Sequence, residues 1–358
     1  MASSKELGNF YSFIADDNER MKGRRRAAAH GDLFAIKELA YFLRYGKEVE
    51  QDCREALKWN LVAASFNDLE SIFIAAKMCT SGIGTEPDLS RATELYKKAI
   101  EICKKIANDR RANIIDRQHA AKKIAYTYEN FFNDGHAAVK WLKKNVLLGD
   151  KSSRFTIAEI YRDGRFMEPS GVDAIEWFTK ILKDKTLPDH ERYSAAFEIA
   201  KIFHEGKGVP RSDSEAVKYF KLSAKAGTVT ARVAYNNLAK IYSKSDELTP
   251  NIGMVLHWLK KAAEVGSRRA TWILAKVFRD GKFGVRQNAT KALEILQDGS
   301  SNPFDIINKV AAMRMIAEIY DKGLGVPENK EKAADLYQKA TSINEEWMQT
   351  INALQMRI

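Results

Sequence analysis

A Gly-Lys-Gly triplet follows an apolar run in the segment AKIFHEGKGVP, which spans Ala200–Pro210. Glycine-rich loops of this kind can cradle a phosphate, because their backbone amides are open to an anion and a lysine adds positive charge. The segment therefore raises the question of whether the chain binds a nucleotide. Related glycine segments recur along the chain, and comparing them answers the question.

Other residues that support catalysis or metal binding occur without the spacing that this chemistry requires. The six histidines include no pair at metal-ligand spacing, and His204 and His257 occupy positions that related segments fill with ordinary residues. The chain has neither the full phosphate-loop motif GxxxxGK[ST] nor a GxSxG nucleophile elbow, and no cysteine has a histidine nearby in the sequence. We therefore expect no enzyme activity, no catalytic residue, no cofactor and no metal site.

The composition is typical of a globular cytoplasmic protein. Of 358 residues, 45% are hydrophobic, 29% are charged and only 7 are proline, which supplies a substantial core and argues against a disordered chain. The N-terminus has no secretory signal pattern, and no apolar run approaches the length of a membrane span. The 3 cysteines, an odd and low number, fit a reducing compartment. We expect a cytoplasmic protein without disulfides or membrane association.

The glycine segment is one of eight copies of a helical pattern, aligned on a shared alanine. A small residue stands five positions before this alanine (position −5), an apolar residue stands at −1, and six copies have an aromatic residue at +3. These positions form one stripe of a helix, and small residues there let a second helix approach closely. The shared alanines are Ala40, Ala76, Ala125, Ala158, Ala200, Ala239, Ala275 and Ala317.

A second, capped helix is predicted in every copy. Six copies have a glycine six residues after the shared alanine, where a left-handed backbone can end a helix. Each copy then has an Asp, Ser or Asn that can accept the first free amides of the next helix. Gly206 in the opening segment therefore belongs to a turn between two helices. The predicted N-caps are Asp52, Asp88, Asp134, Ser170, Ser212, Asn251, Asn288 and Asn329.

Amphipathic helix pairs bury their apolar faces by stacking in order, so the predicted fold class is an all-α α-solenoid. The repeat resembles the Sel-one-like repeat family, a relative of the tetratricopeptide repeats, most closely in segments 195–227 and 311–340. Repeats 3 and 6 lack the glycine turn, and repeat 2 has a longer second helix. The resemblance implies a right-handed superhelix of about eight helix-turn-helix repeats over 30–344, with a capping segment at 1–29 and a capping helix at 345–358.

The same resemblance implies a function. Members of this family are generally adaptors or scaffolds that bind other proteins, and the bacterial members include regulators and immunity proteins. The chain is thus expected to bind a partner protein on its solenoid surface without catalysis. An immunity protein that binds a toxin or effector is one specific form of this expectation, and a signalling adaptor is another.

Positive charge gathers in one part of the chain. The formal net charge is +11, and residues 201–300 alone carry 18 Lys and Arg against 9 Asp and Glu. Positions −6, −3, −2 and +1 are expected to lie opposite the core stripe, and position +1 is a lysine in three consecutive copies. We expect this basic strip to bind an acidic segment of a partner protein, whereas ordinary solvated lysines are the alternative interpretation. The strip comprises Lys201, Lys240, Lys276, Arg269, Asn236, Asn237, Arg232 and Arg268.

Nucleic-acid binding is the alternative function. It rests on three arginine clusters, GRRRAAAHG from Gly23, NDRRANIIDR from Asn108 and GSRRA from Gly266, which could contact phosphates. Aromatic residues at position −3 could stack on bases, although the family pattern favours packing between repeats. These aromatic residues are Phe73, Phe155, Phe197 and Trp272.

Overall fold

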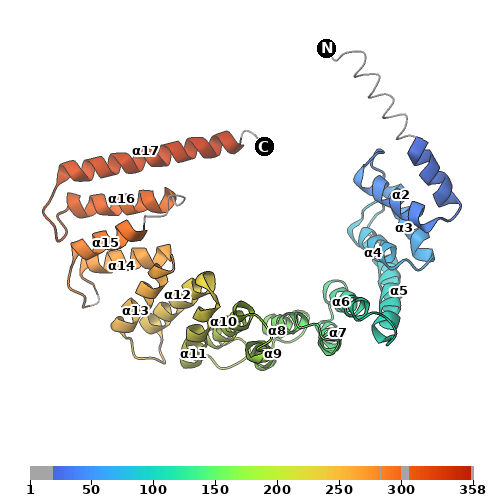
Figure 1. The fold of residues 1–358 in the computed structure, drawn as a ribbon, viewed down its shortest axis with the longest axis horizontal. Helices are drawn as coiled ribbons and strands as arrows, with labels where there is room; N and C mark the ends of the chain where they lie inside the picture. The colour runs from blue at the N-terminus through green and yellow to red at the C-terminus, as the bar shows by residue number, and fades with distance from the viewer. Residues whose placement is uncertain (1–18, 283, 300–305, 356–358) are drawn as a thin grey trace, which may run out of the picture. The chain divides into compact units, whose positions relative to one another are not determined.

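The computed structural model describes residues 19–282, 284–299 and 306–355, which form helices joined by short turns (Figure 1). Residues 19–29 are helical. The helices that follow are α2 (Leu33–Tyr45), α3 (Cys53–Ser65), α4 (Leu69–Ser81), α5 (Leu89–Asn108), α6 (Ile114–Asn130), α7 (Gly135–Leu147), α8 (Ser153–Asp163), α9 (Gly171–Lys183), α10 (Asp189–Glu205), α11 (Asp213–Ser223), the short 3-10 helix η1 (Ala224–Ala226), α12 (Thr228–Lys244), α13 (Ile252–Glu264), α14 (Arg268–Asp280), α15 (Ala289–Gly299), α16 (Ile306–Asp321) and α17 (Lys330–Gln355).

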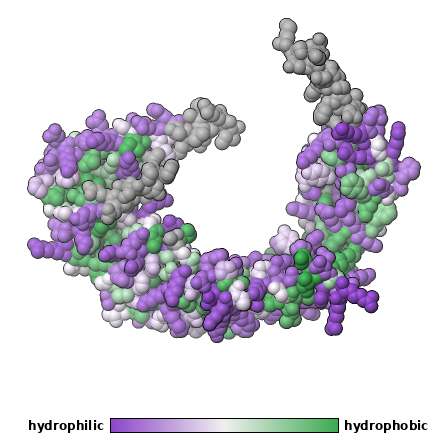
Figure 2. Space-filling view, viewed as in Figure 1, coloured by the Kyte–Doolittle hydropathy of each residue, from purple (hydrophilic) through white to green (hydrophobic). Residues whose placement is uncertain are grey.

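Within the described residues, consecutive helices form eight pairs, from α2 and α3 to α16 and α17, and each pair is one copy of the predicted repeat. Each helix packs mainly against its neighbours along the chain, as in a solenoid, so the predicted all-α solenoid is confirmed. The chain divides into two compact units. Unit 1 comprises Met1–Ser153 with Arg165–Met167, and unit 2 comprises Arg154–Gly164 with Glu168–Ile358. In the face shown in Figure 2, hydrophilic side chains are interspersed with apolar ones over both units.

The predicted core stripe is confirmed. Every shared alanine and every small residue at position −5 is buried. Position −1 is also buried in all copies except the last, where Ile316 is half-buried. Small side chains at these positions allow the close packing of first helix against second helix on which the solenoid depends.

The aromatic residues at position −3 pack against the second helix of their own repeat. Phe155 lies 5.2 Å from Phe178 and Phe197 lies 5.5 Å from Phe220, measured between ring centroids in edge-to-face arrangements. These rings are packing residues, but their contacts lie within one repeat, which corrects the expectation that they pack between repeats. The expectation that position −3 faces away from the core is wrong, because the second helix covers this part of the first helix.

All eight predicted N-caps are confirmed, because each side chain accepts a hydrogen bond from the backbone amide three residues later. A second contact also recurs in every repeat: the backbone amide of the N-cap residue donates to the carbonyl three residues after the shared alanine. In repeat 5 this bond joins Ser212 to Phe203 at 2.9 Å, and in repeat 3 it joins Asp134 to Tyr128 at 2.9 Å. This hydrogen bond therefore closes the turn even in the repeats whose turn lacks glycine.

The structure confirms that the glycine segment is a turn. Gly206 ends α10 in the left-handed conformation, with φ of 67°, and its amide donates to the carbonyl of Ile202. Gly208 meets the preceding repeat so closely that a Cβ atom there would lie 2.4 Å from the backbone nitrogen of Gly171. The Lys207 ammonium forms an ion pair with Asp163 at 3.1 Å. Lys207 and Gly208 therefore make contacts between repeats.

The ends of the solenoid are also helical. Met21 and Ala28, in the helix before α2, are buried in the core formed with α2 and α3, whereas residues 1–18 of the predicted capping segment lie outside the described residues. The expected boundary at residue 345 falls inside α17, which continues for 26 residues from Lys330 to Gln355. Within the described ranges, none of the helices combines the length and apolar character needed to cross a membrane.

Candidate partner-binding groove

A groove of about 580 Å³ lies between α10 and α12, the first helices of repeats 5 and 6, and α11 contributes to its floor. We name it the α10–α12 groove. Three residues of the predicted basic strip, Lys201, Asn237 and Lys240, line it, and Lys244 joins them one turn after Lys240. Apolar side chains form part of its floor, including Phe197 and Phe220. The groove thus combines an apolar floor with lysines on both long walls and one exposed carboxylate, Glu205, on α10.

The lysines of the groove differ in how their charge is compensated. Lys201 lies 3.2 Å from the carboxylate of Glu198, which also forms an ion pair with Arg162. Lys240 and Lys244 are exposed and have no carboxylate partner among the residues that the structure describes. These two lysines therefore carry the positive charge that remains available to an acidic ligand.

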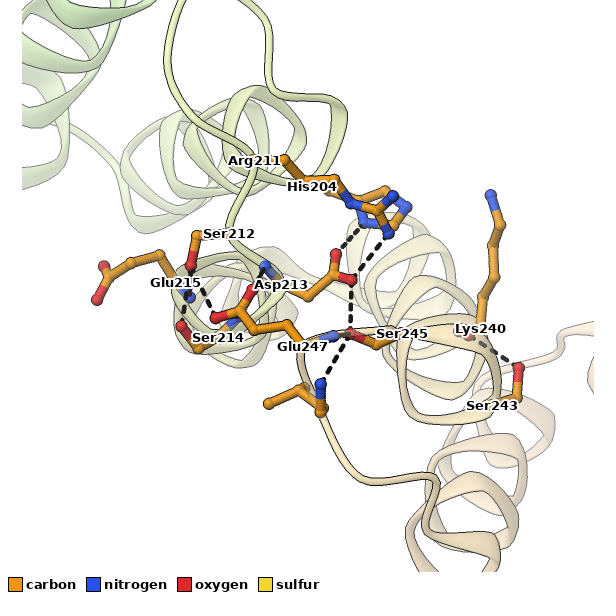
Figure 3. Close-up of polar contacts among 11 residues, drawn as sticks. His204, Arg211, Ser212, Asp213, Ser214, Glu215, Lys240, Ser243, Ser245 and Glu247 are labelled. Atoms are coloured by element: carbon orange, nitrogen blue, oxygen red, sulfur yellow. Dashed lines mark hydrogen bonds and ion pairs between the residues drawn. The ribbon is translucent and has the colours of Figure 1, made fainter.

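A cluster around the buried Asp213 forms one end of the groove (Figure 3). Its carboxylate accepts hydrogen bonds from Ser245 at 2.6 Å and Arg211 at 2.9 Å, and the Nδ1 atom of His204 lies 2.7 Å away. Burial alone would raise the pKa of Asp213, but the hydrogen bonds from Ser245, His204 and Arg211 outweigh it and hold the pKa below its ordinary value. Asp213 thus stays ionised, and the neighbouring side chains named above compensate its negative charge.

The cluster replaces a glycine contact between repeats. Asp213 is the first residue of α11, and the corresponding residue Gly171 of α9 touches Gly208 in the next turn. The turn after α12 lacks glycine, and Ser245 and Glu247 instead bind Asp213 through its side chain and its backbone amide. Glu247 also accepts a hydrogen bond from the amide of Ser214, so it satisfies free amides at the start of α11. His204 therefore has a structural partner, as its repeat position suggested.

The rest of the predicted strip is not in the α10–α12 groove. Lys276, Arg268 and Arg269 are exposed on α14, and Arg232 is half-buried on α12. Asn236 exchanges hydrogen bonds with Ser267, the N-cap of α14, at 2.9 and 3.1 Å. These hydrogen bonds join α12 to α14, and a binding role of Asn236 stays a prediction.

Lys244 is the groove residue that the sequence reasoning missed. It follows Lys240 by four residues in a predicted helix, so helical periodicity could have identified it. Lys244 stands at position +5, which the predicted strip does not include. In the part of the chain that the structure describes, no group of three or more His, Cys, Asp or Glu side chains is arranged to hold a metal ion.

Comparison with known sequences identifies the repeat. The family model described as "Sel1 repeat" matches seven segments that together exceed half of the chain: 34–65, 70–101, 154–182, 194–228, 232–267, 269–297 and 310–343. The pair α6 and α7 has no match of its own, although it has the same N-cap and turn closure as the other pairs. No curated protein gives a significant match to the chain.

Several solved structures are similar to this chain. A Sel1 repeat protein from Oxalobacter formigenes is 17% identical, with 94% of this chain and 93% of that chain covered and a TM-score of 0.48. A protective antigen of uropathogenic Escherichia coli displaying an SLR fold is 19% identical, with 99% and 81% covered and a TM-score of 0.38. An immunity protein from Pseudomonas aeruginosa is 14% identical, with 66% and 82% covered and a TM-score of 0.26.

Proposed function

The chain belongs to the Sel1 repeat family, and from this premise we propose that it is a non-catalytic scaffold that binds an acidic segment of a partner protein in the α10–α12 groove. Sel1 repeats generally mediate protein–protein interactions. The observation that carries the proposal is the pair Lys240 and Lys244, whose charges face a groove with an apolar floor and have no carboxylate partner among the described residues. Such charges speed association and select for acidic partners.

Charge reversal in the groove tests this proposal. We expect the double variant Lys240→Glu, Lys244→Glu to lose a partner that the wild-type chain captures from its native host, because two attractive contacts become repulsive. A matched control reverses two exposed lysines outside the groove, Lys185 and Lys225. Captured proteins are identified by mass spectrometry, and affinity for the purified partner is then measured over a salt series. Equal capture by wild type and groove variant, with the same salt dependence, would refute the proposal.

Lys276, Arg268 and Arg269 extend the same proposal to α14. A long acidic segment that leaves the groove along repeat 7 would meet these exposed basic side chains. Reversal of Lys276 is expected to weaken binding of a long partner segment and to leave binding of a segment confined to the groove unchanged. Titration with peptides of two lengths distinguishes these cases.

The arginine clusters support nucleic-acid binding less well than the groove supports a protein partner. In the cluster at Gly23, Arg24 forms ion pairs with Glu38 and Glu48, at 3.2 and 2.6 Å, and Arg25 pairs with Glu55. These guanidinium groups are already compensated, so fewer of them are available to phosphates. A gel-shift series with single- and double-stranded DNA and RNA at increasing salt tests this alternative, for which we expect no retarded complex at physiological salt.

A toxin or effector is the specific partner that we propose within this function, with the chain acting as its immunity protein in the cytoplasm. The three free cysteines are compatible with a reducing compartment. Co-expression of the captured partner with and without the chain tests this form of the proposal. Protection of cell growth by the wild type, but not by the groove variant, is the expected result.

A further inference from the structure

Another groove, of about 520 Å³, lies in unit 1 between α4 and α6, and α5 contributes to its lining. We name it the α4–α6 groove. Its lining includes three lysines, Lys77, Lys122 and Lys123, and no Asp or Glu. Lys77 occupies position +1 of its repeat, the same position as Lys201 and Lys240 in unit 2. The groove is thus a basic site in a different unit from the α10–α12 groove.

Two of the three lysines have uncompensated charge. Lys122 is held by Asp150 and Ser152, at 3.2 and 2.9 Å. Lys77 and Lys123 are exposed and form no ion pair within the described ranges, and the Lys123 ammonium lies over the ring of Phe73, 5.1 Å from its centroid. An anionic ligand in the groove would therefore meet two cations without first breaking a salt bridge.

Aromatic side chains surround these cations. The Tyr96 and Phe131 ring centroids are 4.3 Å apart, and those of Phe73 and Tyr96 are 6.2 Å apart. Tyr126 is 68% exposed and also lines the groove. Rings packed against one another present edges and partial faces, which suit an inserted apolar or aromatic side chain more than successive stacked bases.

The neighbouring groove, between α2 and α4, has balanced charge. It is lined by Lys37 and Arg44 together with Glu38 and Glu70, and Lys37 forms an ion pair with Glu70 at 3.0 Å. The uncompensated positive charge of the α4–α6 groove therefore does not continue into α2. A nucleic acid needs a continuous basic track along its backbone, whereas a short peptide needs only one such site.

We propose that the α4–α6 groove binds a short acidic peptide segment of a partner protein, in which an aromatic side chain enters among Phe73, Tyr96 and Phe131 and flanking carboxylates contact Lys77 and Lys123. This site is independent of the α10–α12 groove. It gives the chain a second docking point, so that one partner could bind at two places or two partners could bind at once.

A labelled peptide tests the site directly. The probe is a fluorescein-labelled peptide with one Trp flanked on each side by two Glu, and its binding to the full chain is measured by fluorescence anisotropy. We expect the variant Lys77→Gln, Lys123→Gln to bind about tenfold more weakly, because two charge contacts near an apolar surface are lost. The matched control, Lys97→Gln, Lys105→Gln, removes two exposed lysines of α5 that do not line the groove, and its affinity should equal that of the wild type.

Further arms separate the competing outcomes. Weaker binding of a peptide with Gly in place of Trp would support the aromatic contribution, and equal binding would overturn it. Loss of binding in the Lys240→Glu, Lys244→Glu variant alone would assign the peptide to the α10–α12 groove and overturn this proposal while supporting the proposed function. Tighter binding of a single-stranded oligonucleotide than of the peptide would also overturn it. Circular dichroism verifies that each variant is folded.

Discussion

The carboxylate of Asp213 accepts a hydrogen bond from the Ser245 hydroxyl at 2.6 Å, and this contact joins the start of α11 to the turn after α12. Other repeats make the same connection by bringing two backbones together, as at Gly171 and Gly208. Repeat 6 has no glycine in its turn, so a buried charge and its donors replace a backbone contact. The stability of this junction should therefore depend on side-chain chemistry and on pH.

Removal of the carboxylate should loosen the junction. Asp213→Ala leaves Ser245 and His204 without their partner, and a buried polar group without a partner costs about 1–3 kcal/mol. We expect lower urea stability and faster hydrogen exchange at residues 243–248. Asp246→Ala, at an exposed neighbouring carboxylate, is the control and should leave both measurements unchanged. Equal exchange rates in wild type and Asp213→Ala would contradict this role.

Acid should weaken the same junction. The folded-state pKa of Asp213 lies below its ordinary value, so the folded chain binds fewer protons at this site than the unfolded chain. The stabilisation is fully present above the unfolded-state pKa and is lost as the pH falls through the folded-state pKa, which places the window below about pH 4. Acid unfolding followed by circular dichroism should show that Asp213→Asn lacks part of the pH dependence of the wild type.

Alanine at Gly208 should destabilise unit 2. The residue has φ of 67°, and an added Cβ atom would lie 2.4 Å from the Gly171 nitrogen, so the substitution combines backbone strain with a clash. We expect a loss of about 1–3 kcal/mol in the free energy of unfolding. Gly23→Ala is the contrasting control, because this helical glycine has open space around it and alanine should stabilise the helix by up to about 1 kcal/mol. Thermal unfolding measures both changes.

The cysteines should react very differently with an alkylating reagent. Burial raises the pKa of Cys103 to about 11, and it also raises the pKa of the buried Cys79. Cys53 is half-buried at the start of α3. In the native chain we expect Cys53 to be modified first, whereas all three should react in denaturant. Mass spectrometry of digested peptides checks the order, and rapid native labelling of Cys103 would contradict its burial.

The repeat and its caps were predictable because they depend on local rules. The contact of an N-cap such as Ser212 with the amide of Glu215 spans three residues, and the burial of Ala200 follows from helical periodicity within one segment. A left-handed glycine such as Gly206 is also a local requirement. These rules hold within each copy, so all eight N-caps and the glycine turns could be identified from residue types and spacing.

The binding surfaces were predictable only in part, because their chemistry depends on residues one repeat away. Lys122 has its carboxylate partner Asp150 28 positions further along the chain, whereas the pair between Lys201 and Glu198 spans only three residues of α10 and could have been predicted. Position −3 was assigned to an open face, but in repeat 5 the second helix covers it. The periodicity of residues along one helix does not show which of its faces a neighbouring helix covers.

The sequence by itself thus determined the class of fold, the number of helix pairs, their caps and the identity of the glycine segment as a turn. Only the tertiary structure decided that Lys122 pairs with Asp150, that Asn236 joins α12 to Ser267, and that Asp213 and Ser245 replace a glycine contact. The physical reason is the range of the interactions. Backbone conformation and capping depend on neighbours within a few positions, whereas the hydrogen bonds between repeats and the formation of a groove depend on side chains that stacking brings together from 30 or more positions apart.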